Sequence, residues 1–362
     1  PGYAAPGTQS AGAGLVAHGT EANNAFVLGA NLTIDGRVNI TRNGLTALTL
    51  YGLAGDDSFA ISSGHGYSTV AIDGGPAAGA DTATFTGGTS AITLQLGTSP
   101  VSAIDAIVSS TGFGAVSLTG VEAANVIAGM RNVTVRGTVE DDVLTYQPTG
   151  ADAGTVRKAG TGLAANLSAV GTLGIDGVGG NDTLTVFGTT ADDAFTVSSA
   201  AVMLSAFQGV DTLANVGTLK VYGDAGVDTF SVTPGAAAIY LFGDAPLGGS
   251  PGDALTLNTA ADVTFQPGLQ SGAGRFDAAG AQPVTFEQME QLTAVGDRGH
   301  RITVPGTSGA DAFTLAAISG DDFTVTLNGA AVTCIDFASA TLEGSDGNDA
   351  FIEINSGAGG TE

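Results

Sequence analysis

The sequence predicts an all-β fold, a parallel β-helix or β-solenoid built of tandem repeats, on three observations. The chain has 362 residues, of which 57 are Gly, about twice the usual share. Its 35 acidic residues are 27 Asp and 8 Glu, and Asp favours turns and caps over helix. Two short phrases also recur at regular spacing. Hydrophobic residues make up 43% of the chain, which is enough for a core and excludes a disordered acidic polymer.

The first recurring phrase, typified by GTTADDAFTV, begins at Gly19, Gly137, Gly188 and Gly306. The first two copies are 118 residues apart, as are the last two, and 51 residues separate the middle pair. The second phrase, G-x-x-G-x-D followed by an apolar residue, comes about 33 to 40 residues after each copy of the first. We therefore expect a lead-in at 1–18, long units at 19–136 and 188–305, and short units at 137–187 and 306–362, the last ending at the start of a further unit.

The runs between these phrases predict short strands. Segments such as 46–51 and 324–327 alternate Thr with aliphatic residues and are bounded by Gly and Asp. The segment 286–294, FEQMEQLTA, is the one helix-like stretch. Its counterpart one period earlier, 117–126, contains a glycine, so we expect a strand and a turn in both places.

Tandem antiparallel β-sandwich domains are the alternative architecture. The pairs Asp35-Gly36, Asp73-Gly74 and Asp176-Gly177 are hairpin signals that would suit sandwiches. A unit of 51 residues is small for a free-standing sandwich of ~100 residues, however. In a solenoid each coil buries its apolar face against its neighbours, so units of unequal length are accommodated. The solenoid is therefore the predicted architecture.

Composition also excludes several classes of partner and site. The formal net charge is −25 and the 10 Lys and Arg residues are scattered, so nucleic acid is not an expected partner. No apolar run approaches the ~18 residues of a membrane span, and none is expected. Cys334 is the single cysteine, so neither an internal disulfide nor a thiolate metal site is predicted.

Three Asp-rich turns resemble the haemolysin-type (RTX) calcium repeat: 179–184, 223–230 and 344–351. The resemblance implies a parallel β-roll in which Asp carboxylates and backbone carbonyls of successive turns bind calcium. Tandem copies every nine residues are typical of that family, whereas the copies here are single and tens of residues apart. The chain as a whole is similar to giant bacterial surface proteins built from β-repeats, which implies a secreted, adhesive or structural protein.

The same turns supply the candidate metal ligands. Calcium takes six to eight oxygen ligands in flexible geometry, and adjacent carboxylates repel each other unless they are solvated or bridged by a cation. Capping of a turn by an Asp that accepts backbone N–H bonds is the metal-free alternative. Asn23-Asn24 replaces a doubled acid in the first unit and is expected to be the weakest site. The candidate calcium ligands are Asp56, Asp57, Asp141, Asp142, Asp182, Asp192, Asp193, Asp224, Asp228, Asp321, Asp322, Asp346 and Asp349.

No catalytic site is expected, because almost every notable feature recurs at the repeat period whereas a catalytic site is unique. His18, His65 and His300 lie in glycine-rich contexts typical of solvated loops. Arg298, His300 and Arg301 form one basic cluster, which would suit an acidic partner or an acidic turn of another protomer. A β-helix enzyme acting on polysaccharide remains an alternative, because paired carboxylates are plentiful.

The predicted role is that of an extracellular structural or adhesive repeat protein at the surface of a bacterium: a rod, surface layer or fibre segment, stabilised by calcium. Self-association with further copies is expected, with surface glycan as a second partner. A carbohydrate-binding adhesin domain is the other alternative, in which Tyr51, Tyr222 and Tyr240 would line a face.

Overall fold

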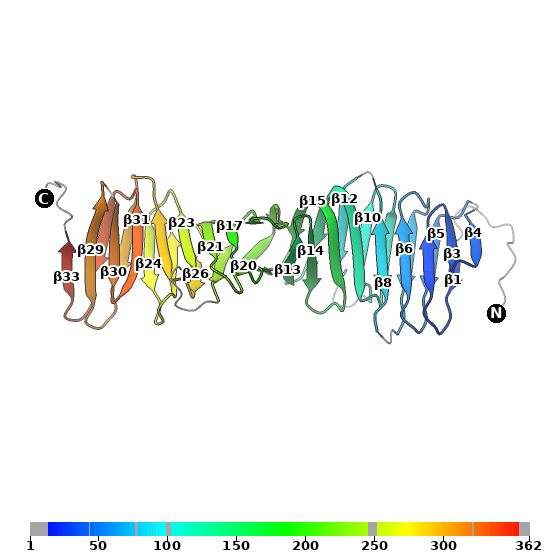
Figure 1. Cartoon of the computed structure of the whole chain (residues 1–362), viewed down its shortest axis with the longest axis horizontal. Helices are drawn as coiled ribbons and strands as arrows, with labels where there is room; N and C mark the ends of the chain where they lie inside the picture. Colours follow the sequence, from blue (N-terminus) through cyan, green and yellow to red (C-terminus); the bar gives the residue numbers. More distant parts are fainter. Residues whose placement is uncertain are drawn as a thin grey trace. The chain divides into compact units, whose positions relative to one another are not determined.

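A computed structural model describes residues 14–42, 44–76, 79–88, 90–98, 103–244, 252–320 and 322–354. The fold is all-β with 58% of residues in strands, and the predicted β-solenoid is confirmed. The chain forms two compact units, one of residues 1–182 with 210–215 and the other of residues 183–209 with 216–362. In the described part of the chain, no helix is long and apolar enough to span a membrane. Within each unit the strands lie side by side in successive coils (Figure 1).

Each coil has a strand that leads into a glycine-containing corner and a strand that leaves it, here called the pre-corner and post-corner strands. In the first unit, parallel pre-corner strands stack in register, with His18 opposite Tyr51 and Tyr51 opposite Asp73. The post-corner strands stack in the same way, with Phe26 opposite Phe59. The pre-corner strands are β1 (Gly14–His18), β5 (Ala47–Tyr51), β7 (Thr69–Asp73) and β11 (Gly114–Thr119). The post-corner strands are β2 (Ala25–Leu28), β6 (Ser58–Ser62), β8 (Thr82–Thr86) and the first half of β12 (Ala123–Arg136), on which the first half of β15 (Ala164–Asp176) stacks in parallel.

Antiparallel meanders are inserted between coils of this unit. One joins β2 to β3 (Asn31–Ile34) and β4 (Val38–Thr41), a second joins β9 (Ile92–Leu96), β10 (Ala106–Ser110) and β11, and a third joins β13 (Val143–Gly150), β14 (Ala153–Lys158) and β15. Asp35 and Gly36 take positive φ angles of 51° and 64° at the turn between β3 and β4, so this predicted hairpin signal is a real hairpin. The pairs at 73–74 and 176–177 lie at corners instead. β19 (Thr212–Ala214) pairs in parallel with the end of β15.

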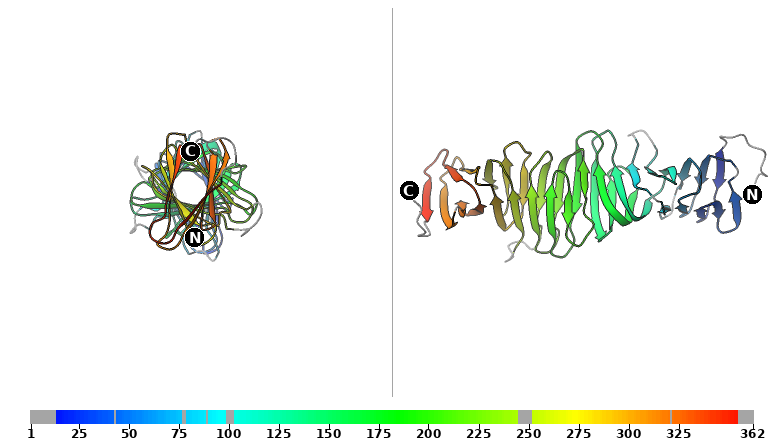
Figure 2. Two further views of the ribbon diagram at one scale, coloured as in Figure 1. Left: turned by 90° about the vertical axis from the view of Figure 1, so that its left-hand side faces the viewer. Right: turned by 90° about the horizontal axis from the view of Figure 1, so that it is seen from above.

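The second unit repeats this plan, and Figure 2 shows its stacked strands from two further sides. One sheet of this unit runs in the order β18 (Val202–Leu204), β17 (Ala194–Ser198), β21 (Thr229–Thr233), β23 (Ala254–Asn258), β27 (Gln291–Val295), β31 (Ala330–Ile335), β30 (Asp322–Leu327), β29 (Ala312–Ser319) and β33 (Ala350–Ile354). Within it, β29, β30 and β31 form an antiparallel meander. Its remaining strands are β16 (Asp182–Phe187), β20 (Val216–Tyr222), β22 (Ala238–Phe242), β24 (Val263–Pro267), β25 (Gly274–Ala278), β26 (Val284–Glu287), β28 (Arg301–Pro305) and β32 (Ser339–Glu343). The helix-like segment 286–294 is strand and turn, as predicted.

Buried and exposed side chains alternate along the strands, and the buried ones form the core. In β5 the side chains of Leu48 and Leu50 are buried while their neighbours are half-exposed. Parallel register places identical side chains above one another, so Phe195 and Phe230 stack at 4.9 Å with an interplanar angle of 2°. The core of each unit is therefore a set of apolar columns that run from coil to coil.

Candidate functional site

The recurring corner consists of a glycine and an acidic residue that folds back onto it. At Gly177, a Cβ atom would clash with Oδ2 of Asp182 and with the carbonyl oxygen of Asn215 in the next coil. Gly223 is enclosed in the same way by Asp228 and by the carbonyl of Gly243. Only glycine lets the backbone approach both oxygen atoms, and this explains why glycine opens each recurring phrase.

The acidic residue of each corner links its coil to the preceding one. The backbone N–H of Asp57 donates to Oδ1 of Asp81 at 2.6 Å, and the N–H of Asp81 donates to Oε2 of Glu122 at 2.7 Å. The same pattern repeats in the second unit, where the N–H of Asp228 donates to Oδ1 of Asp253 at 2.7 Å. We call each such series of hydrogen-bonded corner residues an acid ladder.

Four acid ladders are present in the described residues. Two have four members and two have two members. They are Asn24–Asp57–Asp81–Glu122, Asp142–Asp182, Asp193–Asp228–Asp253–Glu290 and Asp311–Asp349. The long ladders lie within 19–136 and 188–305 and the short ladders within 137–187 and 306–362.

The first member of three ladders is closed off by a side chain from a neighbouring meander. Nδ2 of Asn24 donates to Asp35 at 3.0 Å, and Nδ2 of Asn328 donates to Asp311 at 2.6 Å. Nζ of Lys158 lies 2.8 Å from Oδ1 of Asp142, a carboxylate whose side chain is 1% exposed. In later ladder members Oδ1 accepts an N–H from the preceding coil. At the first member, the side chain from the meander takes the place of that hydrogen bond.

The second carboxylate oxygen distinguishes two kinds of corner. In corners that begin Gly-Thr, the threonine N–H donates to it: Thr189 donates to Asp193 at 2.6 Å and Thr307 donates to Asp311 at 2.7 Å. In G-x-x-G corners the residue after the first glycine has a positive φ, 81° at Val178, which turns its N–H away. Among the described residues, the buried Oδ2 atoms without a hydrogen-bond partner are those of Asp57, Asp182 and Asp228 in G-x-x-G corners and of Asp81 and Asp253 in longer corners.

Burial of these orphaned oxygens favours the protonated carboxyl. Desolvation raises the pKa of Asp228 to about 7 and that of Asp81 to about 6, and nearby acids add to both shifts. Burial likewise raises the pKa of Asp57, Asp182 and Asp253. Both the G-x-x-G corners and the longer corners therefore hold acids that bind protons more readily than an exposed Asp does.

The doubled acids divide between two roles. In the pairs 56–57, 141–142 and 192–193 the second acid is the ladder member, whereas the first is at least partly exposed and caps a backbone N–H of the next coil. Oδ1 of Asp56 accepts from Gly79 at 2.6 Å, and Oδ1 of Asp192 accepts from Val227 at 2.8 Å. Oδ1 of Asp141 accepts from Asn181 at 2.7 Å. Each pair thus makes two hydrogen bonds to the neighbouring coil.

The other predicted ligands lie apart from one another or outside the described residues. Oδ1 of Asp322, at the start of β30, accepts the N–H of Asp336 at 3.2 Å. Asp224 takes a positive φ of 74° at a corner, and Asp346 is exposed at the last one. Asp321 lies outside the described residues. Among the described side chains, no group of three or more His, Cys, Asp or Glu is placed to hold a metal ion.

The metal-site prediction missed five ladder members: Asp81, Asp253, Asp311, Glu122 and Glu290. The sequence carried a signal for four of them. Asp81 and Asp253 each end a glycine-rich segment, 73–81 and 243–253, that precedes an apolar strand, and the two glutamates are 168 residues apart in equivalent segments.

The structure also describes three further candidates from the sequence: His65, the basic cluster and Tyr222. The expectation of a solvated loop is wrong for His65, which is 2% exposed, and burial lowers its pKa. The basic cluster pairs with acids of its own chain: Arg298 lies 2.6 Å from Asp336, and His300 2.7 Å from Asp297. Tyr222 stacks between Phe187 and Phe242, at centroid distances of 5.3 and 4.3 Å, so other rings cover both of its faces.

Comparison with known proteins gave no match: no protein-family model matches the chain, and neither does any curated protein.

Proposed function

We propose that this chain is an extracellular structural or adhesive repeat segment of a bacterial surface protein, part of a surface layer or fibre. The observation that carries the proposal is that the recurring residues make the contacts that hold the coils together. The glycines, the Gly-Thr threonines and the ladder acids all make contacts within or between coils. These contacts build the scaffold again at each period, as a structural role requires.

Calcium stabilisation is the finer part of this proposal. The outer acids Asp56, Asp141 and Asp192 each accept one backbone N–H through Oδ1 and lie where a cation can reach them from solvent. Hard oxygen ligands of this kind suit calcium, with water completing the coordination. A chain of net charge −25 also gains from any bound cation, because the cation relieves repulsion among the carboxylates.

The partners of such a segment are further copies of itself, with surface glycans as a second class. Labelling of intact bacterial cells with an antibody against the folded chain tests the location. We expect labelling without permeabilisation and loss of the epitope when external protease is added. Labelling that requires permeabilised cells, or turnover of acidic polysaccharides by the purified chain, would overturn the proposal.

A further inference from the structure

The turn between β6 and β7 buries a histidine. Residues 63–68, here called the His65 turn, connect the two strands in the first unit. The side chains of His65 and Tyr67 are 2% and 5% exposed, and the centres of their rings lie 5.9 Å apart. His18 and His300, the other two histidines, are at least partly exposed. His65 is therefore the histidine whose charge state the fold controls most strongly.

A hydrogen bond fixes where His65 can take up a proton. The backbone N–H of Tyr67 donates to Nδ1 of His65 at 3.1 Å. Because Nδ1 accepts this bond through its lone pair, the proton of the neutral ring is on Nε2. A second proton can bind only at Nδ1. Once bound, it turns Nδ1 into a donor that faces another donor, so the bond to the Tyr67 N–H is lost.

The surroundings of His65 disfavour a charged ring. Its Nε2 atom is buried and has no hydrogen-bond partner. Burial lowers the pKa of His65, a contact with the backbone of Phe113 opposes that shift in part, and the positive charge of Arg42 adds to it. Arg42 lies 5.8 Å from the centre of the Tyr67 ring, and these two residues are the charged and titratable groups that face His65. The turn 111–113, which packs against the His65 turn, carries no titratable side chain.

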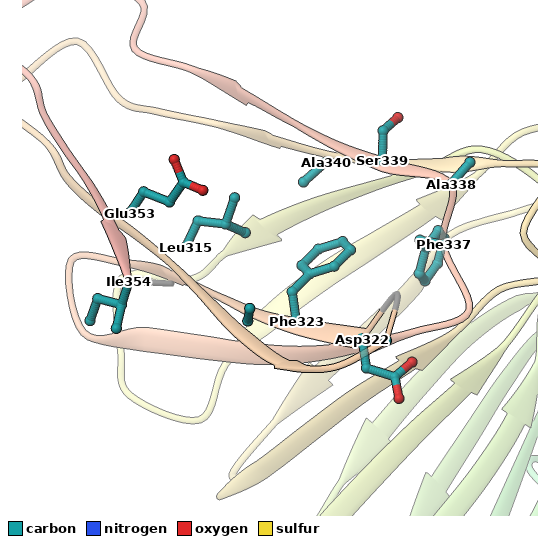
Figure 3. A pocket seen from close by; sticks show the side chains of 11 residues that line it. Leu315, Asp322, Phe323, Phe337, Ala338, Ser339, Ala340, Glu353 and Ile354 are labelled. Atoms are coloured by element: carbon teal, nitrogen blue, oxygen red, sulfur yellow. The ribbon is translucent and has the colours of Figure 1, made fainter. Parts of the chain in front are cut away.

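An exposed acid elsewhere in the chain shows what burial changes. Glu353 lies exposed at a hollow of about 270 Å³ in the second unit (Figure 3), where water solvates its charge. His65 has no such access to water. A proton on His65 therefore leaves a buried cation without a partner, unless the turn opens and hydrates the ring.

Two hydrogen bonds to neighbouring turns hold the His65 turn closed. The N–H of Gly64 donates to the carbonyl of Gly112 at 2.8 Å, and the guanidinium of Arg42 donates to the carbonyl of Gly66. The strands on either side have separate pairing, β6 with β2 and β8, and β7 with β5 and β11. The turn can therefore open locally while the stacked strands stay paired.

We propose that the His65 turn is a proton-operated latch, closed while His65 is neutral and opened by mild acid. In the closed turn a protonated ring loses the Tyr67 N–H bond and stays dry, whereas in the open turn water solvates it. The closed turn is thus most stable at neutral pH and loses stability as the pH falls below 6.5, the ordinary pKa of histidine. This inference goes beyond the proposed function and does not depend on it.

The latch responds to pH in the opposite sense to the acid ladders. Burial raises the pKa of the ladder acids Asp81 and Asp228, so acid stabilises their corners. Melting of the whole chain sums both effects. The latch therefore has to be measured at the His65 turn itself.

Hydrogen–deuterium exchange of the intact chain, read by mass spectrometry, tests the latch. Exchange is compared at pH 7.5 and pH 5 after correction for the intrinsic rate of each peptide. We expect the protection of residues 63–68 and 111–115 to fall about tenfold at pH 5, within the limit of roughly thirtyfold that an exposed histidine of pKa 6.5 sets there. Peptides from the stacked strands of the second unit should not lose protection. Equal protection of the His65 turn at both pH values would overturn the inference.

Substitutions assign the effect to the imidazole. His65→Asn keeps an acceptor for the N–H two residues further on, as in an Asx-turn, and does not titrate, so its turn should stay protected at both pH values. His65→Phe removes the acceptor and should lose protection at both. His300→Asn, at a partly exposed histidine, is the matched control and should respond to pH as the parent chain does.

The remaining outcomes are also decisive. If His65→Asn still loses protection at pH 5 as the parent does, the proton acts at another group and the latch is refuted. Circular dichroism shows whether each variant is folded. Where a variant does not fold, the exchange of the parent chain at the two pH values decides by itself.

Discussion

The backbone N–H of Asp193 donates a 2.7 Å hydrogen bond to Oδ1 of Asp228, a residue 35 positions later in the chain. This bond crosses from one coil to the next, and its acceptor is fully buried. The acid ladder therefore joins coils at their corners, in addition to the parallel strand pairing on either side.

The ladder predicts that stability depends on pH. Burial raises the pKa of Asp228 from 3.8 to about 7 in the folded state. Between pH 4 and 7 the folded chain thus binds more protons than the unfolded chain, and the free energy of unfolding falls as pH rises. Above pH 7 the loss from this residue is complete. Thermal melts between pH 5 and 8 should show the highest Tm at pH 5.

Asp228→Asn isolates the contribution of that residue. An amide keeps the Oδ1 acceptor for the Asp193 N–H and places a neutral group beside the carbonyl of Gly243. The variant should therefore melt higher than the parent chain at pH 8 and show a weaker pH dependence. Asp346→Asn, at an exposed corner position, serves as the control and should leave the profile unchanged. A lower Tm for D228N at pH 8 would show that this carboxylate is stabilising in its charged form.

The close approach at the corners predicts a large effect of one methyl group. Gly177→Ala places a Cβ against Oδ2 of Asp182 and the carbonyl oxygen of Asn215, so the corner has to open. We expect a loss of about 1–3 kcal/mol in the free energy of unfolding. Gly162→Ala has no atom within 4 Å of the new Cβ and should be neutral. Urea unfolding of both variants checks this, and equal midpoints would contradict it.

The coil architecture was predictable from the sequence because its signals are local and periodic. Alternating residues between Gly and Asp mark strands, and the repeat marks the units that stack. The meanders were harder to predict. The turn at Asp35-Gly36 has a hairpin signal, but the turn between β13 and β14, at residues 151–152, reads Ala-Asp and has none. Tertiary pairing determines such strands, and a sequence pattern does not report it.

The positions of the acids were predictable from the sequence, but the hydrogen bonds that each acid makes were not. The two acids of the pair Asp192-Asp193 look alike in the sequence. In the structure, Asp192 accepts the N–H of Val227 in the next coil, whereas Asp193 accepts the N–H of Thr189 in its own corner. The positive φ at Val178 decides whether a carboxylate oxygen of the neighbouring Asp182 receives a hydrogen bond. That choice depends on the backbone conformation of one residue, which its identity as valine does not indicate.

The aromatic column predicts a strong core effect at Phe230. Its ring is 1% exposed and stacks on Phe195 in the preceding coil. Phe230→Ala leaves a cavity in the column, and we expect a loss of about 3–5 kcal/mol in the free energy of unfolding. Phe230→Leu, the residue found at the equivalent position 255, should lose less than half as much. Chemical denaturation measures both, and equal losses would show that volume at this site is not limiting.

Calcium binding predicts a metal-dependent melting temperature. If the outer acids bind calcium in the folded state only, the ion stabilises that state by mass action, by about 2.7 kcal/mol when its concentration is a hundredfold above Kd. A chelator should lower Tm, and excess calcium should restore it. Magnesium should restore less, because it requires stricter octahedral geometry.

Two controls make the calcium prediction decisive. Sodium chloride at matched ionic strength accounts for screening of the −25 net charge. Asp192→Asn removes one outer carboxylate charge while leaving an oxygen acceptor for the Val227 N–H, so it should reduce the calcium-induced rise in Tm without lowering Tm in chelator. If calcium and matched sodium chloride give the same Tm, the outer acids act as turn caps alone, and screening accounts for any effect of salt.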